Sequence, residues 1–269
     1  MSLAGLLSGC CMLGRESYDS PWPAPLPEAL TQDQASRLLQ ARSPEIASLQ
    51  CQTRTVIQRR RRPGKLDLSV TLLYQSPEQL RLIARQPGIE ELAMDWLMTG
   101  DAFMIQLPRQ GAMSWGSLRA LRAADNPLGR LRPLLVVDAL TAENLLAQAL
   151  ADPDAQAEWK IKRERYDAML ESGGRRFEYR LRRTDLLPER LIISDDQGKK
   201  LARIYYEGFN LDADTPVPSA MKIVDVLSGT ILRVKVKVLK RNPALKNAVF
   251  QMQPNPRLRY IPPDELQLD

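Results

Sequence analysis

Long stretches of the chain alternate apolar and polar residues, which is the pattern of strands that bury one face. In the segment 65–74 every second residue is apolar, and most residues between them are charged or carry a hydroxyl group. The segment 231–240 repeats the alternation, with arginine and lysine on its polar side. Each segment predicts a strand with one apolar face. The apolar positions are Leu66, Leu68, Val70, Leu72 and Tyr74 in the first and Leu232, Val234, Val236 and Val238 in the second.

Turn-forming pairs such as Pro63-Gly64, Gly173-Gly174 and Ser228-Gly229 separate further segments of strand character. Because these connections are short, neighbouring strands are predicted to pair antiparallel in one strongly curved sheet. The predicted strands are 46–61, 66–75, 79–85, 91–98, 102–107, 112–116, 158–170, 175–183, 189–195, 200–208, 219–227 and 231–240.

Helical periodicity appears in two regions. Thr31 is placed to cap a helix through Arg42, and a second region between residues 118 and 150 carries Leu134 and Val137 on an apolar stripe. A curved sheet must cover its concave face, and these helices are the predicted cover. The predicted fold class is therefore mainly β with helices (α+β), a large curved antiparallel sheet forming a half-open barrel covered by helices. The helices of the second region are predicted over 118–124, 128–140 and 141–150.

The amino terminus reads MSLAGLLSGCC, and its residues Leu7 to Cys10 form the sequence LSGC. This resembles a lipobox, the site at which a bacterial lipoprotein signal is cleaved and its cysteine receives diacylglycerol. The resemblance assigns lipidation to Cys10. No Lys or Arg precedes Cys10, whereas a secretory signal has a positively charged start, so the true start is expected further upstream. A chance match in an apolar terminus remains the alternative.

Prolines at every second position from Pro21 to Pro27 follow the lipobox and indicate an extended, semi-rigid spacer. Such a spacer suits a domain tethered to a lipid anchor. The chain is therefore predicted to divide into a signal remnant with the lipobox (1–10), a proline-rich linker (11–29), a half-barrel domain (30–262) and a tail (263–269).

The composition of the chain excludes several classes of partner and of reaction. The formal charge of +6 admits anionic partners, but no aromatic RNA-binding signature, zinc-finger spacing or basic heptad array accompanies it, so nucleic acid is not an expected partner. The chain has no histidine and its three cysteines lack paired spacing, so no metal site or cofactor is expected. No nucleophile elbow, phosphate loop or dinucleotide motif appears, so no catalytic residue is assigned and the protein is not expected to be an enzyme.

Five stretches together resemble the superfamily of LolA and LolB, the periplasmic lipoprotein carrier and its outer-membrane acceptor, with their lipid-binding relatives. The resemblance would cover roughly residues 30 to 260, and the order and spacing of the stretches agree with the family. The stretches are LLYQSPEQLRL (72–82), MTGDAFMIQLP (98–108), LPERLIISDDQGKKLARIYYEG (187–208), the hairpin 218–238 and NAVFQMQP (247–254).

The resemblance implies an incomplete antiparallel barrel whose apolar cavity, beneath helices, shelters acyl chains. Two departures limit it: Ser76 stands where the carrier has the arginine that latches its lid, and the loop from Gln86 to Glu90 offers only Ile89 where the acceptor has an apolar protruding residue. The alternative is a filled core. The cavity candidates are Leu68, Val70, Leu72, Leu80, Leu82, Leu134, Val137, Leu232, Val234 and Val236.

Other residues have two interpretations each. A run of four arginines before Pro63 is a candidate for binding anionic headgroups, or a solvated hairpin tip that discourages edge pairing. Cys51 is expected to be a small buried strand residue, and Trp96, Trp115 and Trp159 are expected to fill a core. The arginines of the run are Arg59, Arg60, Arg61 and Arg62.

These observations predict a lipoprotein on the periplasmic face of the outer membrane, held by its lipid anchor, whose half-barrel binds lipid acyl chains or a lipoprotein. The outer membrane is favoured because Cys11, and not aspartate, follows Cys10. The alternative is a structural lipoprotein with a filled core that binds a protein partner in an envelope assembly.

Overall fold

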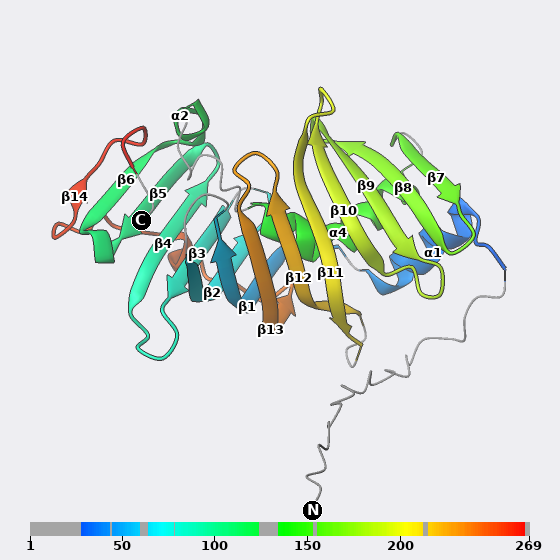
Figure 1. The fold of residues 1–269 in the computed structure, drawn as a ribbon, viewed down its shortest axis with the longest axis horizontal. Helices are drawn as coiled ribbons and strands as arrows, with labels where there is room; N and C mark the ends of the chain where they lie inside the picture. The colour runs from blue at the N-terminus through cyan, green and yellow to red at the C-terminus, as the bar shows by residue number, and fades with distance from the viewer. Residues whose placement is uncertain are drawn as a thin grey trace, which may run out of the picture.

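The computed structural model describes residues 28–43, 45–59, 64–77, 79–123, 134–152, 155–211 and 215–266. Within them, fourteen strands form one open sheet (Figure 1). The strands are β1 (Ser48–Gln58), β2 (Lys65–Gln75), β3 (Gln79–Arg85), β4 (Leu92–Thr99), β5 (Ala102–Leu107), β6 (Ala112–Ser117), β7 (Ala157–Ile161), β8 (Arg165–Ser172), β9 (Arg175–Arg182), β10 (Pro188–Asp195), β11 (Lys200–Asn210), β12 (Val217–Asp225), β13 (Ile231–Arg241) and β14 (Arg259–Tyr260).

The sheet is built outward from a central pairing of β1 with β13, two strands far apart in the sequence. Its order is β14-β6-β5-β4-β3-β2-β1-β13-β12-β11-β10-β9-β8-β7. All the pairs are antiparallel except β14 with β6, which is parallel. The predicted mainly β fold with a large curved sheet is confirmed. The single predicted strand 158–170 was wrong: residues 162–164 form a turn that divides it into β7 and β8.

Two helices pack against each other on the concave face, on the side of the sheet away from the viewer in Figure 1. Helix α1 (Gln32–Arg42) begins at Thr31, whose side chain and that of Gln34 form a capping box. Helix α4 (Leu134–Ala151) is continuous, so the predicted break between residues 140 and 141 was wrong. The predicted helix 118–124 is present as α2 (Leu118–Ala123), whereas residues 128–133 lie outside the described part.

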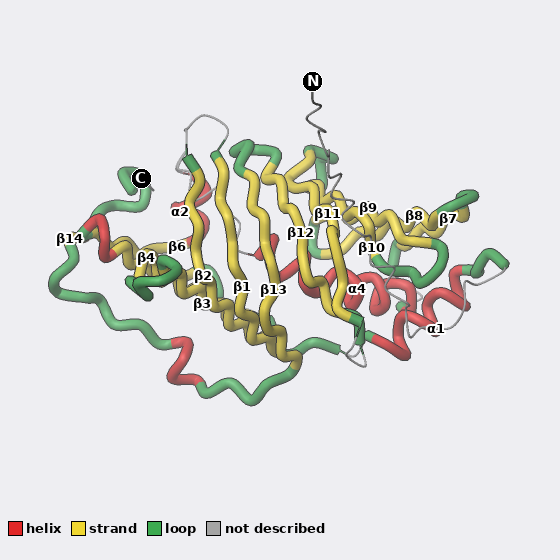
Figure 2. Tube along the Cα trace, turned by 60° about the horizontal axis from the view of Figure 1, so that its bottom comes forward, coloured by secondary structure: helices red, strands yellow, loops and turns green. Residues whose placement is uncertain are grey.

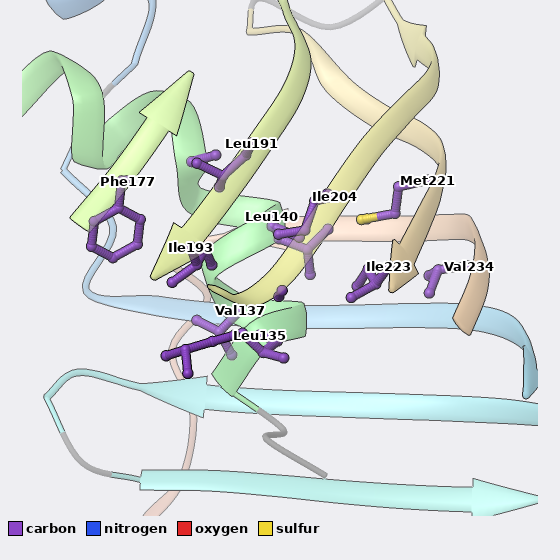
Figure 3. Packing of buried hydrophobic residues seen from close by; sticks show 14 of the residues in the cluster. Leu135, Val137, Leu140, Phe177, Leu191, Ile193, Ile204, Met221, Ile223 and Val234 are labelled. Atoms are coloured by element: carbon purple, nitrogen blue, oxygen red, sulfur yellow. The ribbon is translucent and has the colours of Figure 1, made fainter. Parts of the chain in front are cut away.

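By length and composition α4 is apolar enough to cross a membrane, but 61% of that stretch is buried inside the fold. It therefore acts here as a core helix. Figure 3 shows Leu135, Val137 and Leu140 of α4 facing side chains from β9 to β13. One continuous buried core joins both helices to the concave face of the sheet, and it includes Leu266 near the carboxyl end.

A β-bulge between Gln52 and Thr53 changes the alternation of β13. Val234 and Val236 face the core side, as predicted, but Val238 pairs with Gln52 and is 40% exposed, while Leu239 packs against the core. The predicted apolar face of this strand was therefore wrong at its end, because one extra residue turns the following side chains to the opposite face.

The chain after β13 crosses the convex face of β3 to β5 before it forms β14 (Figure 2). We call residues 242–258 the C-terminal strap. A short 3-10 helix, η2 (Asn247–Phe250), lies within it. Phe250 packs with Leu73 and Leu97 in a second, smaller core on the convex side. The strap thus gives β2 to β4 a buried layer on both faces.

Candidate functional site

The ten cavity candidates come together on the concave side of the sheet. Nine of them belong to the main core or pack against it, and Leu68 is buried outside it at 3% exposure. The buried members of the core are Leu72, Leu80, Leu82, Val137 and Val234, and the half-buried residues packed against it are Val70, Leu134, Leu232 and Val236. The structure therefore brings these residues to one face, where they pack against their neighbours.

One row across this face combines apolar side chains with two polar ones. Cross-strand pairing places Leu72 (β2), Leu82 (β3), Trp96 (β4), Ile105 (β5) and Ser114 (β6) side by side. We call these five residues the concave row. All five are buried, with Ser114 fully enclosed. Pairing register alone brings them together, since they come from five different strands.

Two polar atoms of the concave row have no hydrogen-bond partner among the described residues. They are Nε1 of Trp96 and Oγ of Ser114, and both are enclosed. A buried polar group without a partner costs about 1–3 kcal/mol, so each of these groups would be stabilised by an acceptor placed between them. Sequence analysis treated Trp96 as core filling and did not identify Ser114, because only the strand register shows that the two share a row.

The polar contacts of α4 fix it over β9 to β11. Asp138 forms an ion pair with Arg175 at 2.6 Å, and the Tyr206 hydroxyl donates to the Ala139 carbonyl at 2.9 Å. Burial raises the pKa of Asp138, an effect that Arg175 opposes. Burial also raises the pKa of the Tyr179 hydroxyl, with Asp138 adding to it. These groups are partnered or enclosed under the helix, which indicates a structural role.

At the end of α1, Arg42 pairs with Glu143 of α4 at 2.6 Å, and the Ser43 hydroxyl donates to the same carboxylate at 2.6 Å. Both side chains of the ion pair are nearly buried. Removing one partner of such a pair leaves an uncompensated buried charge. The two helices are therefore joined to each other as well as to the sheet.

A pocket of about 420 Å³ lies on the other side of the sheet, between the strap and the turn that joins β2 to β3. Its lining is mostly polar and includes Gln75, Gln79 and Asn247, with Phe250 as its one large apolar residue. Such a lining does not suit an acyl chain. Among the described residues, no group of three or more Cys, Asp or Glu side chains is placed to hold a metal ion.

Several predicted residues lie elsewhere. Cys10 and Arg60 to Arg62 are outside the described residues, and Arg59 lies just after β1. Cys51 is fully buried in β1, as expected, and burial raises the pKa of its thiol to about 12. The prediction that Trp115 fills a core was wrong. It lies on the convex side, 39% exposed, with its ring tilted against that of Tyr260.

Comparison with known proteins gave matches only at the level of structure. No family model matches the chain, and no curated protein matches it. A LolA superfamily protein of Nitrosomonas europaea aligns over 83% of this chain and 99% of its own, with a TM-score of 0.53 and 14% identity. The chain has a LolA-like fold. The predicted resemblance is thereby confirmed for the fold.

Two further structures share this LolA-like fold. A DUF1329 family protein of Desulfovibrio piger aligns over 82% of this chain and 95% of its own, with 13% identity and a TM-score of 0.53. A domain assigned to outer membrane lipoprotein sorting, from Vibrio parahaemolyticus, aligns over 82% of this chain and 97% of its own, with 9% identity and a TM-score of 0.51. The LolA-like fold therefore spans most of this chain and nearly the whole of each of these structures.

Proposed function

We propose that this protein is a lipid-anchored envelope protein that binds an acyl chain, of a lipid or of a lipoprotein, on the concave face of its sheet. The observation that carries the proposal is the concave row, an apolar surface that encloses two polar groups with no hydrogen-bond partner in the described part of the chain. The fold supports it, because one similar structure is assigned to outer membrane lipoprotein sorting. The role is one of binding, without catalysis.

The concave row provides both kinds of contact that an acylated molecule needs. The hydrocarbon lies against Leu72, Leu82 and Ile105, where each buried CH₂ contributes about 0.8 kcal/mol. The ester or amide carbonyl at the head of the chain accepts hydrogen bonds from the indole N–H of Trp96 and the hydroxyl of Ser114. Pairing both donors adds stabilisation that a plain hydrocarbon does not provide.

Binding requires the residues that cover the concave row to shift, because the candidate residues pack against their neighbours there. The shift exposes apolar surface, and the acyl chain covers that surface again. The binding free energy is therefore the gain from burying the acyl chain minus the cost of exposing the apolar surface of the protein. The gain increases with the length of the acyl chain, so the affinity increases with it. A ligand with a short chain does not offset the cost.

Native mass spectrometry of the gently purified full chain tests this binding. The wild type is expected to carry acyl lipid. Ser114→Val removes the buried hydroxyl and is expected to lower the occupied fraction, whereas the matched variant Ser69→Val, on the convex side of β2, leaves it unchanged. A wild type that never carries lipid contradicts the proposal, and so does an equal effect of the two variants.

The anchor is proposed at Cys10, with the domain on the periplasmic face of the outer membrane. Metabolic labelling with a radioactive fatty acid compares Cys10→Ser with its neighbour control Cys11→Ser. The label is expected to disappear only from Cys10→Ser, and the wild type is expected to fractionate with the outer membrane. Label that survives Cys10→Ser excludes this anchor.

The close packing of the concave residues favours a second function, that of a structural lipoprotein with a filled core that binds an envelope protein. Cross-linking in intact cells separates the two functions. Recovery of a protein partner, from cells in which the chain carries no lipid other than its anchor, supports the second function and contradicts the first.

A further inference from the structure

The convex face of β9 to β13 carries a row of cations that the binding proposal does not use. Cross-strand pairing aligns Arg180 (β9), Arg190 (β10), Tyr205 (β11), Lys222 (β12) and Arg233 (β13). We call these residues the basic row. Adjacent strands lie about 4.8 Å apart, so the row extends over about 19 Å. Neighbouring β-strands thus present four positive charges in line.

The row contains two pairs of like charges that lie directly opposite each other. Arg190 pairs in register with Arg180, and Lys222 pairs in register with Arg233. Like charges at such positions destabilise a sheet. Tyr205 separates the two pairs, and the Lys222 ammonium lies 5.8 Å from the centre of its ring. The fold therefore keeps an arrangement that costs stability unless an anion lies over it.

The carboxylates nearby do not neutralise the row. Asp167, next to Arg180 in register, forms its ion pair with Arg165 at 3.0 Å. Glu207 reaches only Arg233, at 3.9 Å, and both side chains are about half exposed, so solvent screens the contact. Within the described residues, Arg180, Arg190 and Lys222 form no ion pair. The enclosed Nε atoms of Arg180 and Arg190 also have no hydrogen-bond partner in that part of the chain.

Two more exposed cations extend the surface. Arg203 on β11 and Lys235 on β13 also face outward, since their strand neighbours point into the core or pack against it. Neither forms an ion pair among the described residues. The formal net charge of +6 is thus concentrated in part on one face of the sheet, opposite to α4. A partner of complementary charge is a surface with many anions.

We propose that the basic row docks this face onto an anionic phospholipid surface, so that the anchored domain lies on the membrane. The inference rests on the proposed anchor at Cys10, which keeps the domain near a bilayer. The first described residues lie against β8, next to β9, on the core side of the sheet, where the Leu30 amide donates to the buried Tyr166 hydroxyl at 2.8 Å. Residues 11–27 provide a connection of up to about 60 Å, which is long enough for this orientation.

Vesicle sedimentation tests the docking with the full chain carrying Cys10→Ser and Cys11→Ser, so that no acyl anchor contributes. The triple variant Arg190→Gln, Lys222→Gln and Arg233→Gln is compared with the control triple, which lowers the net charge equally. The control changes three exposed cations of the strap and β14, namely Lys246→Gln, Arg257→Gln and Arg259→Gln.

The parent chain is expected to bind vesicles of phosphatidylcholine with phosphatidylglycerol at low salt, and to release them at high salt. The basic-row triple is expected to lower that partitioning by roughly a hundredfold, because each of the three cations contributes about fivefold near an anionic surface. The control triple is expected to change it far less. Vesicles of phosphatidylcholine alone are expected to bind none of the proteins.

Three results overturn the docking proposal. The first is a parent chain that does not bind the anionic vesicles, and the second is an equal loss in both triples, which makes net charge the only cause. The third is tight binding of polyglutamate without vesicle binding, which assigns the face to an acidic protein. The protein used for sedimentation carries Cys10→Ser and Cys11→Ser and so has no acyl anchor. A failure of docking therefore says nothing about the proposed anchor or the proposed acyl-chain binding, which fatty-acid labelling and native mass spectrometry test separately.

Discussion

Replacing Arg81 with methionine removes a cation from a largely buried ion pair on the convex side. Arg81 (β3) holds Asp95 (β4) through two hydrogen bonds of 2.9 and 2.7 Å, and it donates to the Val249 carbonyl of the strap at 2.8 Å. The exposed fractions of the two paired side chains are 18% and 11%. Without Arg81 the Asp95 carboxylate lies buried and unpaired, which costs about 3–5 kcal/mol.

The sheet contains a matched control for this change. Arg54 (β1) holds Asp67 (β2) in the same diagonal cross-strand position and also through two nitrogen atoms, but these side chains are 53% and 37% exposed. Solvent screens such a pair, so Arg54→Met is expected to cost much less stability than Arg81→Met. The difference between the variants is the effect of burial.

Urea unfolding measures the loss of stability in both variants, and hydrogen exchange with mass spectrometry locates it. Arg81→Met is also expected to raise exchange across residues 245–253, because the strap loses its contact with Arg81. Arg54→Met is expected to leave that exchange unchanged. Equal stability losses in the two variants, or a strap whose exchange is unaffected by Arg81→Met, refute this account of the convex side.

Three further changes test the core. Burial raises the pKa of Asp138, so the folded protein holds this proton to a higher pH than the unfolded chain does. The wild type should therefore lose stability relative to Asp138→Asn as the pH rises above about 4, and the opposite slope in pH-dependent unfolding contradicts this. In a chain with Cys10→Ser and Cys11→Ser, the enclosed Cys51 thiol, with a pKa of about 12, should react with a thiol reagent at pH 8 only after unfolding, and rapid native labelling argues against its burial. Leu72→Ala should cost about 2–5 kcal/mol in chemical unfolding, since Leu72 is 1% exposed, and a loss under about 1 kcal/mol is inconsistent with its packing.

Local patterns were sufficient to predict most of the strands and the curved sheet. Alternation is set by the period of the strand, so it marked the buried faces of β2 and of most of β13. The pairing of β1 with β13 was not predictable, because it joins segments that lie far apart in the sequence and have no turn between them. The bulge beside Thr53, which turns Val238 outward, depends on that pairing and was missed with it.

The strap and β14 were missed for a different reason. The stretch that contains Phe250 has neither alternation nor helical periodicity, and it is held by single contacts such as that of Gln106 with the Gln253 carbonyl at 2.7 Å. A strand of two residues, Arg259 and Tyr260, is too short to leave a pattern. Such segments are positioned by the surface on which they pack.

The candidate site was predicted in its apolar part only. Alternation placed Leu72 and Leu82 on one face, but the position of Trp96 and Ser114 on either side of Ile105 depends on the registers of β4, β5 and β6. The basic row has the same origin. Arg190 and Lys222 each appear in the sequence as a single charged residue of a predicted strand, and only the register aligns them with further cations.

Quenching of tryptophan fluorescence by a spin-labelled fatty acid tests the central claim most directly. One variant keeps only Trp96, on the concave row, and the other keeps only Trp115, on the convex side, with the remaining tryptophans changed to phenylalanine. The account predicts saturable quenching of Trp96 and none of Trp115, even though Trp115 is the more exposed ring. Two results contradict acyl-chain binding on the concave face. One is quenching of Trp115 without quenching of Trp96, and the other is no quenching of either tryptophan.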